Sequence, residues 1–273
     1  YEIASCLVGS EMCIRDRLGI YDNPSELLSI SLGSAETTLL KLTSAYCSFV
    51  NGGKLVNPIM IDRIQDSEGN TIFNNEKRKC LNCDQISSMS DNYPEIEDNF
   101  PQIFSSETAY QMTSILEGAI QNGTGKNLKD LNIDLAGKTG TTNGNTDTWF
   151  IGFTSKLAIG VYVGSDNPKP LGKYETGAKT ALPIFKKFVK AGVKKRDARP
   201  FKVADNIMMM VIDPLTGKKA EIQSKKTIIE AYKNNQEATI FNLDINNRLK
   251  NNNILRLSLI HISEPTRQEA IAY

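Results

Sequence analysis

The sequence predicts an α+β domain in which helices pack on an antiparallel sheet. Three observations support this prediction: two amphipathic helical patterns precede a run of closely spaced strands, a third follows that run, and a hairpin pattern separates the first two. Helices that lie outside a run of strands, rather than alternating with them, are typical of α+β proteins.

The first predicted helix spans Thr37 to Asn51, and Gly52 and Gly53 follow where a left-handed C-terminal cap belongs. Its apolar residues recur at helical spacing, namely Leu39, Leu42, Ala45, Tyr46, Phe49 and Val50. Residues 55–66 are rich in apolar and β-branched side chains, and a turn at 68–70 leads into 71–73. We therefore expect a β-hairpin after the first helix.

The second predicted helix follows a polar, acidic segment, residues 84–100, which we expect to be a surface loop. Ser105 or Ser106 caps this helix, and Glu107 lies in its first turn, where a negative charge stabilises the positive end of the helix dipole. A Gly-Thr-Gly sequence at 123–125 ends the helix. Its predicted buried stripe consists of Ala109, Met112, Leu116, Ala119 and Ile120.

Three strands follow, over residues 133–142, 148–154 and 157–164. The connection at 155–156 is so short that the second and third strands must be antiparallel neighbours. The last amphipathic helix spans 178–191, and strand character resumes over 201–213 before a turn at 214–217. The inward-facing residues predicted for that helix are Leu182, Phe185, Phe188 and Val189.

The composition excludes several functional classes. Lys plus Arg is 32 and Asp plus Glu is 31, so the net charge of +1 argues against nucleic acid as a partner. No apolar run approaches the roughly 20 residues that a membrane-spanning helix needs. With 40% hydrophobic and 23% charged residues, the chain is an ordinary globular protein.

The two ends of the chain differ in character from its middle. Residues 1–17 and 255–273 lack helical or strand periodicity and resemble translated sequencing-adapter read-through. We treat both as non-native flanks, with genuine disordered tails as the alternative. The only histidine, His261, lies in the second flank, so residues 18–254 offer no Ser-His-Asp or Cys-His nucleophile and no histidine-ligated metal site.

Three cysteines remain in the middle of the chain. Cys47 lies in the apolar first helix and is predicted to be a small buried residue. Cys80 and Cys83 have the spacing of half a zinc site or a redox pair, but no second cysteine pair completes a metal site. We expect a local disulfide or two idle thiols there, with a metal or redox function as the alternative. A disulfide would suit a compartment outside the cytoplasm.

The strongest candidate for a catalytic motif is the sequence Gly-Lys-Thr-Gly-Thr-Thr, from Gly137 to Thr142. Gly-Lys-Thr also ends phosphate-binding loops, but these need a glycine at the position of Asn132 and a helix afterwards. Lys-Thr-Gly on a strand is instead a motif of serine acyl-transferases that act on penicillin and D-alanyl peptides. A plain strand with an exposed lysine is the structural alternative.

The surroundings of this motif make the match specific. Asp147 to Gly152 and Gly160 to Gly164, together with the motif, resemble the transpeptidase domain of class A penicillin-binding proteins, the bifunctional peptidoglycan synthases. The resemblance extends in order over roughly residues 18–231. Further matching stretches are Leu32-Gly33, Thr37 to Gly53, Ala109 to Gly125 and Ala178 to Phe188.

The resemblance implies a serine β-lactamase-like transpeptidase fold, with residues 18–198 as the C-terminal part of that domain and 199–254 as a small β-rich extension. It implies a catalytic role for Lys138, whose charge would help orient the nucleophilic serine. Thr139 and Thr141 would bind a substrate carboxylate, Gly140 would keep the strand approachable, and the Thr141 backbone N–H would help form the oxyanion hole. No cofactor or metal is implied.

Two motifs of the family are missing from the expected positions. No serine in the chain has a lysine three residues later, so the nucleophile motif Ser-x-x-Lys is absent. Ser-x-Asn occurs only at Ser90 and Ser165, both misplaced in chain order, and we interpret both as chance matches. We therefore expect a domain truncated on its N-terminal side and inactive alone, with the apolar faces of 133–159 and of the second helix partly uncovered.

The parent protein would cross-link peptidoglycan by serine acyl transfer, with D-Ala-D-Ala stem peptides and β-lactams as its partners. The resemblance places it at the periplasmic face of the bacterial inner membrane, anchored in that membrane through a part not found in this chain. The alternatives are a D,D-carboxypeptidase, a serine β-lactamase relative or a non-catalytic binding domain.

Overall fold

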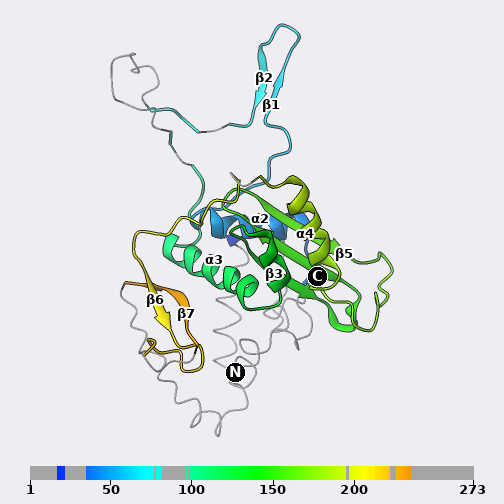
Figure 1. Ribbon diagram of the computed structural model, residues 1–273. Helices are drawn as coiled ribbons and strands as arrows, with labels where there is room; N and C mark the ends of the chain where they lie inside the picture. The colour runs from blue at the N-terminus through cyan, green and yellow to red at the C-terminus, as the bar shows by residue number, and fades with distance from the viewer. Residues whose placement is uncertain are drawn as a thin grey trace, which may run out of the picture.

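The centre of the fold is a three-stranded antiparallel sheet with the strand order β3-β4-β5 (Figure 1). Its strands are β3 (Ala136–Thr141), β4 (Thr148–Phe153) and β5 (Ala158–Val163). The computed structural model describes residues 17–21, 35–76, 78–81, 96–97, 99–194, 197–221 and 226–234. The three predicted strands and their antiparallel pairing are confirmed, although each strand is slightly shorter than expected.

Helices cover both faces of this sheet. α2 (Leu39–Val50) and α3 (Ser106–Gln121) pack on one face, and α4 (Ala181–Gly192) packs on the other. Short 3-10 turns, η3 (Lys126–Leu131) and η4 (Asn143–Asn145), flank β3. The α+β class predicted from the sequence is thereby confirmed.

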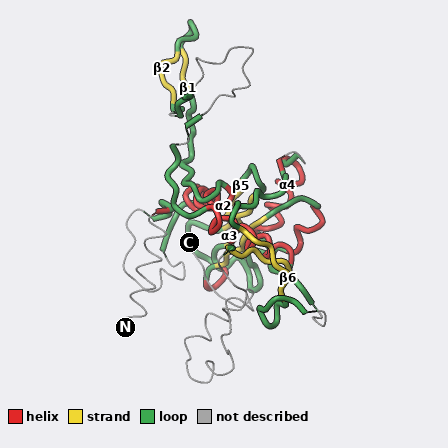
Figure 2. The backbone as a smooth tube through the Cα atoms, turned by 90° about the vertical axis from the view of Figure 1, so that its left-hand side faces the viewer, coloured by secondary structure: helices red, strands yellow, loops and turns green. Residues whose placement is uncertain are grey.

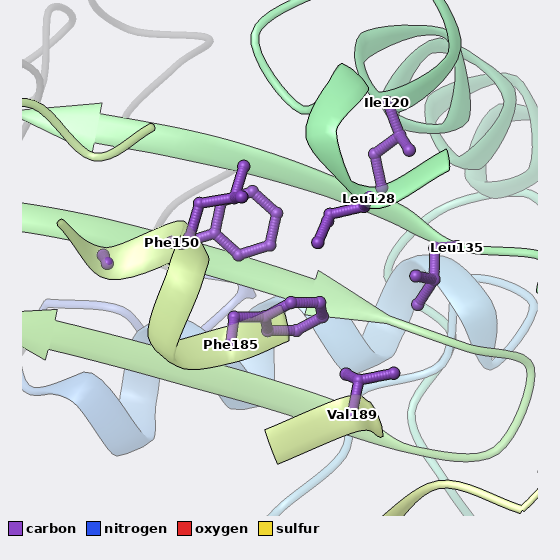
Figure 3. Close-up of a cluster of buried hydrophobic side chains, with 8 residues drawn as sticks. Ile120, Leu128, Leu135, Phe150, Phe185 and Val189 are labelled. Atoms are coloured by element: carbon purple, nitrogen blue, oxygen red, sulfur yellow. The ribbon is translucent and has the colours of Figure 1, made fainter. Parts of the chain in front are cut away.

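The largest hydrophobic cluster lies between the sheet and α4 (Figure 3). Phe150 of β4 and Phe185 of α4 meet edge to face, with their ring centroids 4.6 Å apart. Ile120, at the end of α3, also reaches this cluster. Its buried members are Ile120, Leu128, Leu135, Phe150, Ala181, Leu182, Phe185 and Val189.

The helix caps follow the sequence. The side chain of Thr38 accepts a hydrogen bond from the Lys41 N–H at the start of α2, and Gly52 and Gly53 adopt the expected positive φ after its end. Ser105, one of the two predicted caps, accepts from the Thr108 N–H at the start of α3. Both helices therefore begin where a hydroxyl satisfies an otherwise unpaired backbone donor.

The buried stripe of α3 differs in part from the prediction. Three of its five predicted members are buried, whereas Met112 and Ala119 are only half-buried. Thr113 is buried in addition, because its hydroxyl donates to the Ala109 carbonyl at 3.0 Å and is thereby satisfied inside the helix.

The prediction that Phe188 faces inward is wrong. Leu182, Phe185 and Val189 are buried against the sheet, but Phe188 is 55% exposed. At about 100° per residue, Leu182 and Val189 lie on one side of Phe185, and Phe188 lies roughly 60° away on the other. The buried stripe of α4 is therefore narrower than the apolar pattern indicates.

The central strand is covered more fully than expected for residues 133–159. Every residue of β4 is buried, because α2 and α4 enclose this strand from opposite faces. The outer strands β3 and β5 are only partly buried, and Ile115 of α3 is 56% exposed, so the second helix is partly uncovered as expected.

A β-hairpin projects from the body on extended segments (Figures 1 and 2). It consists of β1 (Arg63–Gln65) and β2 (Thr71–Asn74), which pair antiparallel as predicted, and every residue of both strands is exposed. The strand expected over 55–66 is shorter than predicted, because its first part pairs with no strand among the described residues. Most of the segment 84–100 lies outside the described residues.

A second two-stranded sheet, β6 (Ile207–Ile212) and β7 (Ile228–Lys233), lies against α3. The Gln111 side chain donates to the Ala231 carbonyl at 3.0 Å, and the Lys233 ammonium donates to the Thr108 hydroxyl at 2.8 Å. The strand character predicted over 201–213 is present only over Ile207–Ile212, and the predicted turn at 214–217 is present, with Gly217 at a φ of 67°.

The cysteines differ in their surroundings. Cys47 is half-buried rather than fully buried, and this burial raises the pKa of its thiol. Cys80 is disulfide-bonded. Cys83, its expected partner, lies outside the described residues. Across the described ranges, no three Cys, His, Asp or Glu residues gather as a metal site would require, and no helix there has the length and apolar character to cross a membrane.

The packing of α4 predicts a contrast between two phenylalanines on one helix. Phe185→Ala should lower the free energy of unfolding by about 3–5 kcal/mol, because it leaves a cavity against Phe150. Phe188→Ala should change it by less than about 1 kcal/mol, since that side chain is largely exposed. Urea unfolding of both variants measures the difference, and equal losses would contradict the placement of α4.

Candidate active site

The outer edge of β3 is open within the described part of the chain, because β4 is its only strand partner there. At the end of the ladder the Thr142 N–H donates to the Asp147 carbonyl at 3.0 Å, so Thr142 directs its backbone groups toward β4. Residues that face the partner strand in this way alternate with residues that face away from it along an antiparallel ladder. Thr141 and Thr139 therefore direct their backbone N–H and C=O groups away from β4, toward the open edge.

The same alternation separates the side chains of the motif. Lys138 and Gly140 lie opposite Ile151 and Trp149, and this face of the sheet carries α2. Thr139 lies opposite Phe150, whose ring packs against α4, so Thr139 and Thr141 share the other face. The structure thus places all four predicted residues on one strand, with the lysine and the two hydroxyls on opposite sides of the backbone.

A cleft of about 280 Å³ lies beside Lys138, between α2 and the sheet. It is lined by Leu42, Tyr46, Lys138, Thr139, Gly140, Trp149 and Ile151. Thr141 does not line it. Sequence reasoning missed Leu42 and Tyr46 of α2 as part of this wall, because their spacing marks them only as part of a helix face.

The Lys138 ammonium is held at the open edge. Its Nζ donates to the Thr139 carbonyl at 3.0 Å, which is one of the edge-facing backbone groups. The residue as a whole is exposed, yet nearby protein atoms partly desolvate its ammonium, and this desolvation lowers the pKa of Lys138. A cation close to the edge can polarise a hydroxyl or stabilise negative charge that develops there.

The hydroxyls of Thr139 and Thr141 each have a hydrogen-bond partner from another part of the chain. The Thr139 hydroxyl lies 3.1 Å from the hydroxyl of Thr124, in the turn after α3. The Thr141 hydroxyl accepts a hydrogen bond from the Gly177 N–H at 3.0 Å, in the loop before α4. These partners are separated from the motif by 15 and 36 residues, so no local pattern identified them.

Gly177 can occupy its position only because it has no side chain. A Cβ there would lie 2.5 Å from the Gly140 carbonyl oxygen and 2.6 Å from that of Trp149. The loop before α4 therefore lies directly on the backbones of β3 and β4, beside the Thr141 hydroxyl.

The turn between β3 and β4 is fixed by a buried carboxylate. Asp147 accepts hydrogen bonds from the Tyr162 hydroxyl at 2.6 Å and from the Thr146 hydroxyl at 2.8 Å. Its own N–H donates to the Thr142 hydroxyl at 2.8 Å. These contacts hold the end of β3 in register with β4.

Neither chance Ser-x-Asn match lies in this strand. Ser165 follows β5 and is exposed, whereas Ser90 lies outside the described residues.

The penicillin binding protein transpeptidase domain family matches residues 17–190 of the chain. The chain belongs to this family. Individual relatives narrow the comparison within this family. The chain is 42% identical over 240 residues to penicillin-binding protein 1A of Rickettsia conorii, and 43% identical over 221 residues to that of Rickettsia prowazekii. These alignments cover 87% and 80% of the chain but only 30% and 28% of the relatives' own length.

A solved structure agrees. The crystal structure of penicillin-binding protein 1A from Haemophilus influenzae matches with a TM-score of 0.65 and 29% identity, over 83% of this chain and 38% of the other. The expected transpeptidase fold and the resemblance to class A penicillin-binding proteins are thereby confirmed.

The Asp147 contact predicts how stability depends on alkaline pH. The hydrogen bond from Tyr162 raises the pKa of Tyr162 to about 12, and burial raises that of Tyr46 to about 12. Because both values exceed the unfolded value near 10, the stabilisation is complete below about pH 10 and is lost as the pH rises toward about 12. Tyr162→Phe should therefore lose less stability over this interval than the wild type.

Urea midpoints measured across that interval test this expectation. Tyr174→Phe is the matched control, because the Tyr174 ring is largely exposed, and it should retain the wild-type dependence. An identical fall in Tyr162→Phe and wild type would show that the Asp147 contact does not perturb the tyrosine.

Proposed function

We propose that the longer protein that includes this sequence is a serine D,D-transpeptidase that cross-links peptidoglycan. The single observation that supports this most is the open edge of β3, where Lys138, two threonine hydroxyls and an outward Thr141 N–H lie on one strand of a transpeptidase-family domain. An acyl-transfer enzyme needs those groups together: a cation, donors for a carboxylate, and a donor for the oxyanion.

The reaction proceeds in two acyl transfers. A serine supplied by a Ser-x-x-Lys segment loses its proton to a base and attacks the carbonyl carbon of the penultimate D-Ala. The C–N bond to the terminal D-Ala breaks, and that residue leaves as a free amine after taking up a proton. An amine of a neighbouring stem peptide then attacks the ester, loses a proton and releases the serine. β-Lactams acylate the same serine by opening their ring.

The residues of β3 have separate roles in this scheme. The Thr141 N–H, which is directed to the open edge, donates to the oxyanion that forms on the attacked carbonyl. The hydroxyls of Thr139 and Thr141 donate to the carboxylate of the substrate. Lys138 provides positive charge near the edge and helps to orient the serine, and Gly140 lets the substrate backbone approach.

The proposal extends to partners and location. Stem peptides that end in D-Ala-D-Ala and β-lactams are the proposed ligands, and the names of the relatives, penicillin-binding proteins, support the second. Peptidoglycan lies outside the cytoplasm, so we place the protein at the periplasmic face of the inner membrane, anchored there. The disulfide at Cys80 supports an oxidising compartment. We also propose that residues 18–198 belong to the transpeptidase domain and that 199–254 are a small β-rich extension, of which the structure describes 199–221 and 226–234.

The chain as given should not react covalently with penicillin. It contains no Ser-x-x-Lys sequence, and loss of a nucleophilic serine costs a comparable enzyme roughly 10⁶-fold in turnover. Intact-mass spectrometry after incubation with benzylpenicillin should show the unmodified chain. A stoichiometric acyl adduct would refute this expectation and would make Ser165 and Ser90 candidate nucleophiles.

Lys138 can be tested in the extended chain, by which we mean this sequence preceded by the upstream part of a transpeptidase domain with its Ser-x-x-Lys segment. Lys138→Ala should slow acylation by benzylpenicillin on the order of 100-fold, because a charge near the reacting groups is lost. Its melting temperature should not change, since backbone pairing holds the strand. Lys187→Ala, on the exposed face of α4, is the matched control. Wild-type acylation by Lys138→Ala would falsify the assigned role.

Thr141→Val in the same extended chain should separate binding from chemistry. The variant loses the hydroxyl but keeps the backbone N–H, so the dissociation constant for benzylpenicillin should rise about 10-fold. The first-order acylation rate constant should change less. Stopped-flow measurements over a range of penicillin concentrations separate the two quantities, and a loss confined to the rate constant would contradict the carboxylate-binding role.

A further inference from the structure

Thr124 occupies a fixed position behind the open edge of β3. The turn that carries it is held by two bonds to one acceptor, because the N–H groups of Gly123 and Gly125 both donate to the Ala119 carbonyl at 3.1 Å. Gly123 lies so close to α3 that a Cβ there would approach the Ala119 carbonyl oxygen to 2.7 Å. The Thr124 hydroxyl therefore reaches the Thr139 hydroxyl, 3.1 Å away, from a well-anchored turn.

The number of protons determines the direction of this hydrogen bond when substrate is bound. A carboxylate only accepts hydrogen bonds, and a threonine hydroxyl has one proton to donate. If Thr139 donates its proton to the substrate carboxylate, the bond between the two threonines can form only with Thr124 as donor. The result is a chain in which Thr124 donates to Thr139 and Thr139 donates to the carboxylate, and each bond polarises the next.

Thr141 has the same arrangement with a different donor. The Gly177 N–H donates to the Thr141 hydroxyl at 3.0 Å, and a backbone amide nitrogen cannot accept in return. The Thr141 proton is therefore left for the carboxylate. Thr124 differs because a side-chain hydroxyl can be removed by substitution, whereas the Gly177 amide cannot.

We infer that Thr124 is a positioning residue that orients the Thr139 hydroxyl as a donor and thereby makes the site selective for ligands with a free carboxylate. The inference rests on the proposed function, since it assumes that Thr139 binds a carboxylate. Thr124 itself touches no reacting atom. Its effect should appear in the binding of acidic ligands and be absent for ligands in which the carboxylate is masked.

The test compares acylation of the extended chain by benzylpenicillin and by its methyl ester, which lacks the negative charge. The wild type should react faster with the acid. Thr124→Val, which removes only the hydroxyl, should lower the acid-to-ester ratio roughly 10-fold through the dissociation constant for the acid, with the rate for the ester unchanged. Thr124→Ser should restore the ratio, and Thr124→Ala should behave as Thr124→Val does.

A double variant separates positioning from a direct role. In Thr139→Val the acceptor is gone, so adding Thr124→Val should lower the ratio no further. An unchanged ratio in Thr124→Val and Thr124→Ala, or equal losses for acid and ester, would overturn the inference, because the second result indicates a merely structural role. A wild type that reacts with neither compound would overturn the proposed function and this inference with it.

Discussion

The pairing of β3 with β4 is the constraint on which the site depends. The backbone hydrogen bond from the Thr142 N–H to the Asp147 carbonyl, together with the register, determines which backbone groups along the ladder face outward. A slip by one residue would exchange the faces of Lys138 and Thr139 and turn the Thr141 N–H into the sheet. The buried Asp147 carboxylate, with Tyr162 as its donor, stands at the end of the ladder where such a slip would begin.

Most of the fold could be predicted because buried residues recur in the sequence with the period of a helix or a strand. The alternation and short turns of the central strands, and the spacing of apolar residues in α2, α3 and α4, are local features. The errors arose where burial depends on a partner. Thr113 has a polar side chain yet is buried, because its hydroxyl forms a hydrogen bond within α3. Phe188 is apolar yet exposed, because the sheet contacts only a narrow stripe of α4.

The candidate site shows the same division. Lys138, Thr139, Gly140 and Thr141 are contiguous, so a motif was enough to locate them. Thr124 and Gly177 come from the ends of two different connections, and only the folded chain brings them to Thr139 and Thr141. A motif specifies which groups are available for chemistry, whereas the direction in which a hydroxyl donates depends on neighbours that are distant in sequence.

The β1–β2 hairpin lies apart from this machinery (Figures 1 and 2). The turn at its tip is held by hydrogen bonds within the turn itself. The Asn70 N–H donates to the Asp66 carboxylate at 2.7 Å, and the Gly69 N–H donates to the Asp66 carbonyl at 3.1 Å. Because these backbone donors of the turn are satisfied locally and the strands are exposed, a label attached at Ser67 should disturb neither the sheet nor the helices. The hairpin is thus a suitable attachment point for immobilising the protein on a sensor surface through Ser67, at a distance from the edge of β3.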